Sequence, residues 1–444
     1  MVSMTLDWEE GLRVWLAPFV ARLGHKSRRR MLPVYLSGLI GPGDRKSVQP
    51  MAARLAPGEY DQLHHFVAAG TWDPAPLVAE LLAKADALVG GSDAVLVIDD
   101  TALPKKGRHS VGVAAQYASA LGKTANCQTL VSLTLARGEV PVMVGLRLFL
   151  PESWTSDPAR LERAGVPADH RVYRTKPEMA LAEVDRLIAA GVRFGCVLAD
   201  AGYGLSAPFR QGLTARGLAW AVGIPRHQKV YPADVKLIFP VAGRGRCRQH
   251  HVPDLLSVPA EDMLAEAEWR EVRWRMGTKG ALKARFAARR VRVADGAPQR
   301  IGDKGRQHLP GGEAWLVGEL RTTGEKKYYL ANLPAATSLR TLAATIKARW
   351  VCEQAHQQLK EELGLDHFEG RSWSGLHRHA LMTMIAFAFL QDRRLADAGR
   401  GKKNQRPTAS AKPARHPTGH RQSRPATAAI PMPPLPTTNQ HPAL

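Results

Sequence analysis

The sequence predicts an α/β fold in which a mixed β-sheet is covered by helices. Two short apolar runs, residues 94–98 and 196–199, contain no charged residue and are typical of strands buried on both faces of a sheet. Three further strand patterns lie between these runs, and helical and strand patterns alternate after the second one. Strands first, with alternating helix and strand afterwards, favour a mixed sheet with helices packed on it.

The first 90 residues are predicted to be helical. Leu12, Trp15, Leu16 and Phe19 recur at the spacing of one helix face, and the dipeptide Asp73-Pro74 is a typical start for another helix. A basic cluster lies between these helical patterns: Lys26, Arg28, Arg29, Arg30, Arg45 and Lys46. We expect residues 1–90 to form a helical domain, in which this cluster is either a binding surface or a solvated loop.

Residues 91–225 are predicted to form the first part of the sheet and its helices. After the run at 94–98, strands are expected at 111–118, 128–135 and 140–150. Apolar residues from Leu181 to Ile188 share one helix face, and Gly191 follows as a helix stop. The run at 196–199, a helix at 208–216 and a strand at 218–222 complete this part.

The remaining chain is predicted to divide into three parts. Residues 226–335 contain short strand patterns separated by Gly-rich and charged turns, which predicts a β-rich insertion. Helical patterns return at about Leu339, so residues 336–395 are expected to form a helical second part of the core. Residues 396–444 are rich in Pro, Thr, Ala, Arg and Lys without apolar periodicity, which predicts a disordered basic tail.

The composition indicates a globular protein with a polyanionic partner. Hydrophobic residues make up 45% of the chain, whereas 62 Lys and Arg against 40 Asp and Glu give a formal net charge of +22. A polyanion is the natural partner of such a chain because each neutralised phosphate releases condensed counterions. Ribosome-like or membrane-surface binding would give the same net charge, so the charge alone does not choose among these partners. The four cysteines form no Cys-x-x-Cys pair, and no apolar run reaches about 20 residues, so a cytoplasmic protein is expected.

Three acidic residues are candidates for catalytic residues. Each of the two buried strands ends in aspartate, at Asp100 and Asp200, and strand ends in open α/β sheets commonly assemble sites. A third acid, Glu353, lies in the late helical segment with Arg349 four residues before it and Lys360 seven after it. At 100° per residue these two cations lie within about 40° of Glu353, on one helical face.

Such a set of acids suits divalent metal ions and phosphate chemistry. Mg²⁺ and Mn²⁺ prefer carboxylate oxygens, and three acids can hold two ions. One ion activates a water or a 3′-hydroxyl while the other stabilises the leaving oxygen of an in-line displacement at phosphorus. Each residue alone has an ordinary explanation, a turn residue or a helix ion pair, so the prediction rests on the combination.

These motifs resemble the DDE-type insertion-sequence transposases, in the branch with a Tyr-Arg-Glu-Lys signature. The resemblance rests on the spacing of Arg349, Glu353 and Lys360, on Ile-Asp-Asp-Thr at 98–101 and on Ala-Asp-Ala-Gly-Tyr-Gly at 199–204. Residues 112–128 and 363–371 are also similar to that family, so the resemblance covers about residues 94–391. The tyrosine of the signature is replaced by Ile346.

The resemblance implies an RNase H-like core, two Mg²⁺ or Mn²⁺ ions, and a metal-dependent enzyme that cleaves transposon ends and joins them to target DNA. It implies that Asp100, Asp200 and Glu353 are the catalytic metal ligands, with Asp99 as the alternative to Asp100 because only one of these neighbours can point into the site. Arg349, Lys360, Lys105 and Lys106 are expected to contact DNA, and a homodimer to pair two DNA ends near the nucleoid.

Three other functions are compatible with parts of the pattern. An RNase H-like nuclease without strand transfer would use the same acids, and a catalytically inactive DNA-binding relative would need none of them. A basic RNA-binding protein would be expected to carry a recognisable module of exposed aromatics, and the sequence contains none. The terminal repeat, the target site, the excision route and the oligomeric state are not encoded in these motifs.

Overall fold

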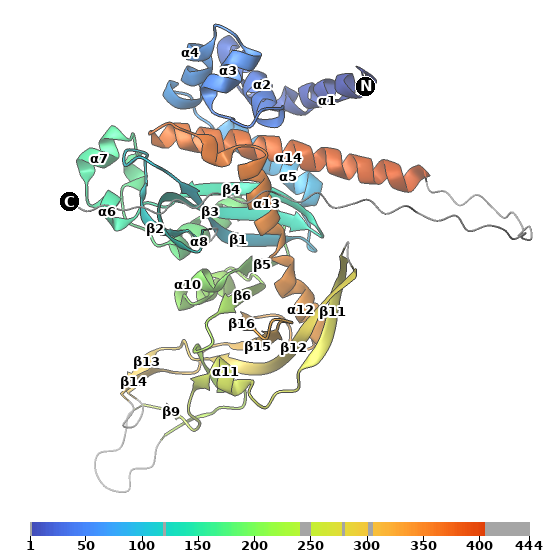
Figure 1. Cartoon of the computed structure of the whole chain (residues 1–444). Helices are drawn as coiled ribbons and strands as arrows, with labels where there is room; N and C mark the ends of the chain where they lie inside the picture. The colour runs from blue at the N-terminus through green and yellow to red at the C-terminus, as the bar shows by residue number, and fades with distance from the viewer. Residues whose placement is uncertain (1, 119–120, 240–249, 278–279, 301–304, 405–444) are drawn as a thin grey trace, which may run out of the picture. The chain divides into compact units, whose positions relative to one another are not determined.

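The computed structural model describes residues 2–118, 121–239, 250–277, 280–300 and 305–404 (Figure 1). The predicted tail lies mostly outside these residues, although the last helix extends to Asn404, past the expected start of the tail. No helix in the described part of the chain combines the length and the apolar composition that a membrane crossing requires.

Helices make up the N-terminal segment, as the sequence predicts. They are α1 (Val2–Ala21), α2 (Lys26–Ile40), α3 (Val48–Leu55), α4 (Tyr60–His64), the π-helical turn η1 (His65–Ala69) and α5 (Ala75–Val89). The basic cluster does not lie between helices throughout, because Lys26 to Arg30 form the start of α2. The long C-terminal helix α14 (Trp373–Asn404) packs against this segment, with Phe389 beside Trp8 and Trp15.

The central sheet has the strand order β4-β3-β1-β5-β6. These strands are β1 (Val95–Pro104), β3 (Lys123–Arg137), β4 (Val140–Leu148), β5 (Cys196–Ala199) and β6 (Trp220–Ile224), and β2 (Ala114–Ala118) pairs with one end of β3. β1, β3 and β4 are antiparallel neighbours, whereas β5 is parallel to both β1 and β6. This mixed sheet confirms the predicted fold class and has the strand order of an RNase H-like core.

Most strands of the segment predicted as a β-rich insertion continue the same sheet. Its strand β16 pairs antiparallel with β6, and the order beyond β6 is β16-β15-β12-β7-β10 with β11 on the other part of β12. The strands are β7 (Lys229–Pro232), β10 (Val258–Pro259), β11 (Arg270–Gly277), β12 (Gly280–Val293), β15 (Glu313–Leu320) and β16 (Lys326–Ala331). Two separate two-stranded sheets, β8 (Leu237–Ile238) with β9 (Val252–Pro253) and β13 (Pro298–Arg300) with β14 (Arg306–His308), and the short helix α11 (Ala260–Met263), complete the described part of this segment.

Helices cover both faces of the sheet and divide its core in two. Val97 of β1 and Leu198 of β5 pack with α12 (Leu339–Ala348) and α13 (Val351–Glu361) on one face. Leu96 and Ile98 of β1 pack on the other face, in the core that includes α5 and α8 (Lys176–Ala189). The remaining short helices are α6 (Glu152–Thr155), α7 (Pro158–Arg163), η3 (Ala168–His170), α9 (Ala201–Gly204), α10 (Ala207–Ala215) and η5 (Leu365–His367).

Candidate active site

The ends of β1 and β5 bring two aspartates side by side. The parallel register pairs Val97 with Leu198 and Ile98 with Ala199, so the next pair along the two strands is Asp99 and Asp200. β5 ends at Ala199, and Asp200 follows it in an extended conformation as the N-cap of α9. The sequence predicts that Asp100 and Asp200 meet, with Asp99 as the alternative, and the register places Asp99 beside Asp200.

The alternation of side chains separates Asp99 from Asp100. Neighbouring residues in a strand point to opposite faces of a sheet. Asp99 lies on the face of Val97, against α12 and α13, whereas Asp100 lies on the face of Ile98. By the same alternation Asp200 shares the face of Leu198, which is also the face of α12 and α13.

Asp100 is held by partners of its own. Its Oδ2 lies 2.5 Å from Nζ of Lys176 at the start of α8, and its Oδ1 accepts a 2.6 Å hydrogen bond from the hydroxyl of Tyr203. Tyr203 is buried, and its pKa is raised by burial and by the negative charge of Asp100. These contacts tie β1 to α8 and to the turn after Asp200.

Asp200 is a half-buried acid in a negative environment. Its Oδ1 accepts hydrogen bonds from the backbone N–H groups of Gly202 and Tyr203, at 3.0 and 3.3 Å. Burial raises the pKa of Asp200, and the carboxylates of Asp99 and Asp100 raise it further, against the opposing effect of Arg349. A positive charge placed here would therefore relieve an unfavourable concentration of negative charge.

Arg349 joins Asp99 to Glu353. Its Nη1 lies 2.5 Å from Oδ2 of Asp99, and its Nη2 lies 2.9 Å from Oε1 of Glu353. Burial lowers the pKa of Arg349, but the negative charges around it, Asp99 foremost, more than offset this and raise its pKa overall. The side chain of Glu353 remains 55% exposed, so one end of this bridge faces solvent.

The helix that carries Glu353 is not continuous with the one before it. The sequence predicts one helical face through Arg349, Glu353 and Lys360, whereas α12 ends at Ala348 and α13 begins at Val351. Arg349 and Trp350 keep right-handed helical backbone angles at this junction. The i to i+4 contact from Arg349 to Glu353 therefore survives the break.

Two further side chains of α13 connect that helix to β1. Sγ of Cys352 lies 3.2 Å from Oδ2 of Asp99. Burial, and next the charge of Asp99, raise the pKa of the Cys352 thiol, so the thiol donates to the carboxylate. Nε2 of His356 lies 2.7 Å from Oγ of Ser132, which donates to the backbone oxygen of Asp99 at 2.9 Å.

The other residues predicted to contact DNA do not share the ion pairs of Arg349 with Asp99 and Glu353. Lys105 donates from Nζ to the backbone oxygens of Asp366 and Phe368, at 3.2 and 2.7 Å, so its ammonium group already has partners within the protein. Lys106 is exposed, and Lys360 is partly buried on α13, where burial lowers its pKa. Ile346, at the position of the tyrosine in the signature, is buried in the core beneath α12.

A large groove opens beside Glu353 and Arg349. Its volume is about 940 Å³, and it lies between β11, β12 and the α12–α13 junction. Cations and aromatics line it, including Arg275, whose guanidinium lies 4.7 Å from the ring centre of the half-exposed Trp350. A groove with this lining next to acidic side chains can accept a nucleic acid strand by phosphate contacts and base stacking.

The acids fit divalent cations by their chemistry. No cluster of three or more His, Cys, Asp or Glu side chains within the described ranges is close enough to hold a metal ion. The guanidinium of Arg349 instead stands between Asp99 and Glu353, where it supplies the positive charge that those carboxylates need. Hard carboxylate oxygens and the raised pKa of Asp200 are the properties expected of a site for Mg²⁺ or Mn²⁺.

Sequence reasoning missed several of these residues. Lys176, Ser132 and His356 have no local signal, because their partners lie on elements distant in the sequence. Tyr203 is part of the motif at 199–204, and Cys352 precedes Glu353, but neither contact follows from sequence position alone.

A family model described as DDE superfamily endonuclease matches residues 18–281, which is more than half of the chain. Asp99, Asp100 and Asp200 lie within the matched residues, and Glu353 lies beyond them. The probable transposase for insertion sequence element IS701 of Microchaete diplosiphon is 31% identical over 169 residues. The alignment covers 38% of this chain and 41% of that relative, less than half of its length.

One solved structure with a similar chain is a piggyBac transposase synaptic complex with hairpin DNA. The structural alignment covers 86% of this chain and 68% of the piggyBac chain, at 11% sequence identity and a TM-score of 0.38. These values are too low to add to the fold described above.

Proposed function

Because this chain belongs to the DDE superfamily endonucleases, we propose that it is a DNA transposase that cleaves transposon ends and joins them to target DNA in a metal-dependent reaction. The observation that carries this proposal is the Arg349 bridge between Asp99 and Glu353, beside the half-buried Asp200. Acids from two adjacent strand ends and one helix thus converge with a cation that can bind phosphate.

We assign the metal ligands as Asp99, Asp200 and Glu353. The resemblance implies Asp100, with Asp99 as the alternative, but Asp100 lies on the opposite face of the sheet and is paired with Lys176 and Tyr203. Asp99 is the register neighbour of Asp200 and shares the face of α13. Asp100 is then a positioning residue that fixes the end of β1.

Two Mg²⁺ or Mn²⁺ ions bound by these acids would activate the attacking water or 3′-hydroxyl and neutralise the charge that develops on the leaving oxygen. Arg349 balances the charge of Asp99 and Glu353, and we propose that its guanidinium binds the scissile phosphate when those acids bind cations. Ser132, His356 and Cys352 hold α13 against β1, and thereby keep Glu353 in line with Asp99.

The partner in this proposal is double-stranded DNA, at the transposon ends and at the target. Residues 91–225 and 336–395 would form the catalytic core, residues 226–335 an insertion that extends its sheet, and residues 1–90 a helical domain for end recognition. Because two ends must be joined in one event, the active complex is proposed to be a homodimer.

The test is cleavage and joining of a labelled duplex that carries the end of the element encoding this chain. The protein is incubated with Mg²⁺, Mn²⁺ or EDTA, beside Glu353→Gln and the control Glu361→Gln, an exposed acid on the same helix. The proposal predicts metal-dependent cutting and joined products that are lost only in Glu353→Gln.

Two other results would identify the alternatives. Cutting without joined products would identify a nuclease that lacks strand transfer. Tight binding to the duplex without cutting, in the wild type and both variants, would identify a DNA-binding protein that has lost catalysis.

A further inference from the structure

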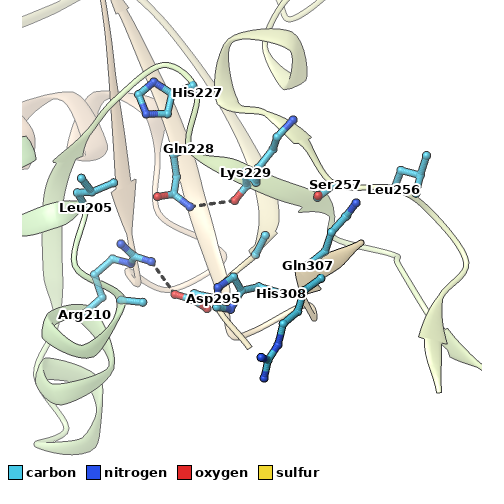
Figure 2. Close-up of a pocket in the computed structure, with 13 residues that line it drawn as sticks. Leu205, Arg210, His227, Gln228, Lys229, Leu256, Ser257, Asp295, Gln307 and His308 are labelled. Carbon is cyan, nitrogen blue, oxygen red and sulfur yellow. Dashed lines mark hydrogen bonds and ion pairs between the residues drawn. The ribbon is translucent and has the colours of Figure 1, made fainter. Parts of the chain in front are cut away.

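A second cavity lies away from the Arg349 bridge, between α10 and the strands of residues 226–335. Its volume is about 550 Å³, which is within the range of small-ligand pockets of roughly 300–1,000 Å³. Figure 2 shows its lining, which comes from the start of α10, the turn after β6, the segment before β10, the turn after β12 and the strand β14. Neither Asp99, Asp200 nor Glu353 contributes to it.

The lining of this cavity is positively charged. It contains the cations Arg210, Lys229 and Arg306 and a single acid, Asp295. The charge of Asp295 is neutralised by an ion pair with Arg210, in which Nη2 of Arg210 lies 2.7 Å from Oδ2 of Asp295. Lys229 and Arg306 are exposed, and no ion pair to either one is found among the residues that the structure describes.

Arg210 is a buried cation at the floor of the cavity. Its side chain is only 2% exposed, and Figure 2 shows its guanidinium directed from α10 toward Asp295. Nη1 donates to the backbone oxygen of Gly204, in the turn that follows Asp200, whereas Nε has no hydrogen-bond partner within the described part of the chain. A buried donor without a partner is costly, and a bound acceptor would remove that cost.

The first turn of α10 adds to the positive potential. Leu205 and Ala207 line the cavity on either side of the N-cap Ser206, so the start of this nine-residue helix faces it. The N-terminus of a helix favours anions because the helix dipole is positive there. In α10 this contribution comes from the dipole, since Pro208 has no N–H and the N–H of Phe209 donates to Oγ of Ser206. The apolar side chains of Leu205 and Leu256 also line this cavity and provide a surface against which a sugar can pack.

We propose that this cavity binds a phosphodiester group of a DNA strand, as a second contact beyond the catalytic acids. The inference rests on the proposed function for the identity of the polymer. Lys229 and Arg306 bind the phosphate oxygens at the mouth of the cavity, and Arg210 with the start of α10 provides the positive floor. The hydrogen bond from Arg210 to Gly204 connects this contact to the turn that positions Asp200.

The test measures binding in EDTA, so that it does not depend on cleavage. A short fluorescent duplex of arbitrary sequence is titrated with the full chain over a series of KCl concentrations. The variant Lys229→Ala/Arg306→Ala is compared with Lys236→Ala/Arg300→Ala. In this matched control Arg300 pairs with Arg306 in the β13–β14 sheet, and neither control residue lines the cavity. All four residues are exposed, so both variants should fold, and their thermal melting is checked first.

The proposal predicts that the cavity variant loses about one salt-dependent phosphate contact per removed cation, a slope smaller by about 1.8 in log Kd against log salt. The control variant should retain the wild-type slope. Equal slopes in both variants would overturn the proposal, whether or not the wild type cleaves DNA. Glu353→Gln should bind DNA with the wild-type slope but should not cut it. This result would show that the DNA contact at the cavity does not depend on catalysis, so each proposal can fail without the other.

Inorganic phosphate and a deoxynucleoside monophosphate are added as competitors at constant ionic strength. If either of them binds at the cavity with Lys229 and Arg306 dependence while the DNA slope is unchanged, the site takes a free phosphate compound, and the DNA assignment is wrong. If neither binds and the slope changes, the phosphate must be part of a strand.

Discussion

Arg349 and Asp99 are 250 positions apart in the sequence, yet Nη1 of Arg349 lies 2.5 Å from Oδ2 of Asp99. The other arm of the same guanidinium binds Glu353. One cation thereby connects the end of a central strand with the helix on the face above it.

Replacing Arg349 with Met should separate metal binding from catalysis. Without the competing guanidinium, Asp99 and Glu353 are free to bind a cation, so the affinity for Mn²⁺ should rise by about tenfold, equivalent to about 1.4 kcal/mol. Cleavage should nevertheless fall, by roughly 100-fold, because a phosphate contact is lost. Calorimetric titration with Mn²⁺ and single-turnover cleavage measure the two effects. Unchanged or weaker Mn²⁺ binding would show that Arg349 does not compete with the metal.

Ser132 and His356 should be energetically coupled to each other. Their contact should affect Glu353 only indirectly, through the position of α13. Ser132→Ala leaves Nε2 of the buried His356 without its partner, at a cost of about 1–3 kcal/mol in the free energy of unfolding. A double-mutant cycle with His356→Phe should give a coupling energy of at least about 0.5 kcal/mol. A positioning role further predicts that kcat falls in Ser132→Ala while KM is retained.

A simple structural role for this pair would give a different result. The coupling energy would remain, but kcat would be unchanged at temperatures where the variant is folded. Gln357→Ala, on the exposed side of α13, is the control and should change neither the unfolding free energy nor kcat.

Gly204 should not tolerate a side chain. A Cβ at this position would lie 1.9 Å from the backbone oxygen of Gly223, so α9 could not approach β6 as closely as it does. Gly204→Ala should therefore lower the free energy of unfolding by about 1–3 kcal/mol, measured by urea denaturation. Gly107→Ala is the control, because nothing lies within 4 Å of a Cβ there. Equal stability of the two variants would contradict the packing of α9 on β6.

The buried histidines should make the fold sensitive to acid. Burial lowers the pKa of His379 from 6.5 to about 4, and the ring is held neutral between the hydroxyl of Tyr35 and the backbone oxygen of Gly364. The unfolded chain takes up a proton at the higher pKa, so stability falls as the pH is lowered from about 6.5 to about 4. The loss from this residue amounts to about 3 kcal/mol at the acid end.

His379→Asn should remove that part of the pH dependence, as measured by urea denaturation at pH 7 and pH 4.5. The variant is expected to be less stable than the wild type at pH 7 and closer to it at pH 4.5. The exposed His65→Gln should keep the wild-type pH dependence. An identical slope in His379→Asn and the wild type would show that His379 is not neutral in the folded protein.

Much of the core could be predicted because buried strands leave a clear pattern. The runs at 94–98 and 196–199 are continuously apolar, since both faces of β1 and β5 are covered by helices. The choice between Asp99 and Asp100 could not be predicted in this way. It depends on which face of the sheet α13 covers. A strand buried on both faces is apolar throughout, so its sequence does not indicate that face.

Two features of the fold depend on contacts that no local pattern contains. The break between α12 and α13 occurs at Arg349 and Trp350, where there is neither Pro nor Gly to indicate it. Residues 226–335 are predicted as a β-rich insertion, but the pairing of β16 with β6, by which this segment extends the sheet, does not follow from the local pattern. Strand pairing across about 100 residues is determined by the whole fold.

The assignment of Asp99 is tested most directly by comparing Asp99→Asn with Asp100→Asn in Mn²⁺-dependent cleavage of a labelled transposon end. The account predicts that Asp99→Asn lowers the cleavage rate by at least about 1,000-fold, because a metal ligand is lost. Asp100→Asn should keep measurable cleavage and mainly lower the melting temperature, because Lys176 and Tyr203 lose their charged partner. The reverse result, with cleavage lost in Asp100→Asn and retained in Asp99→Asn, would contradict the account.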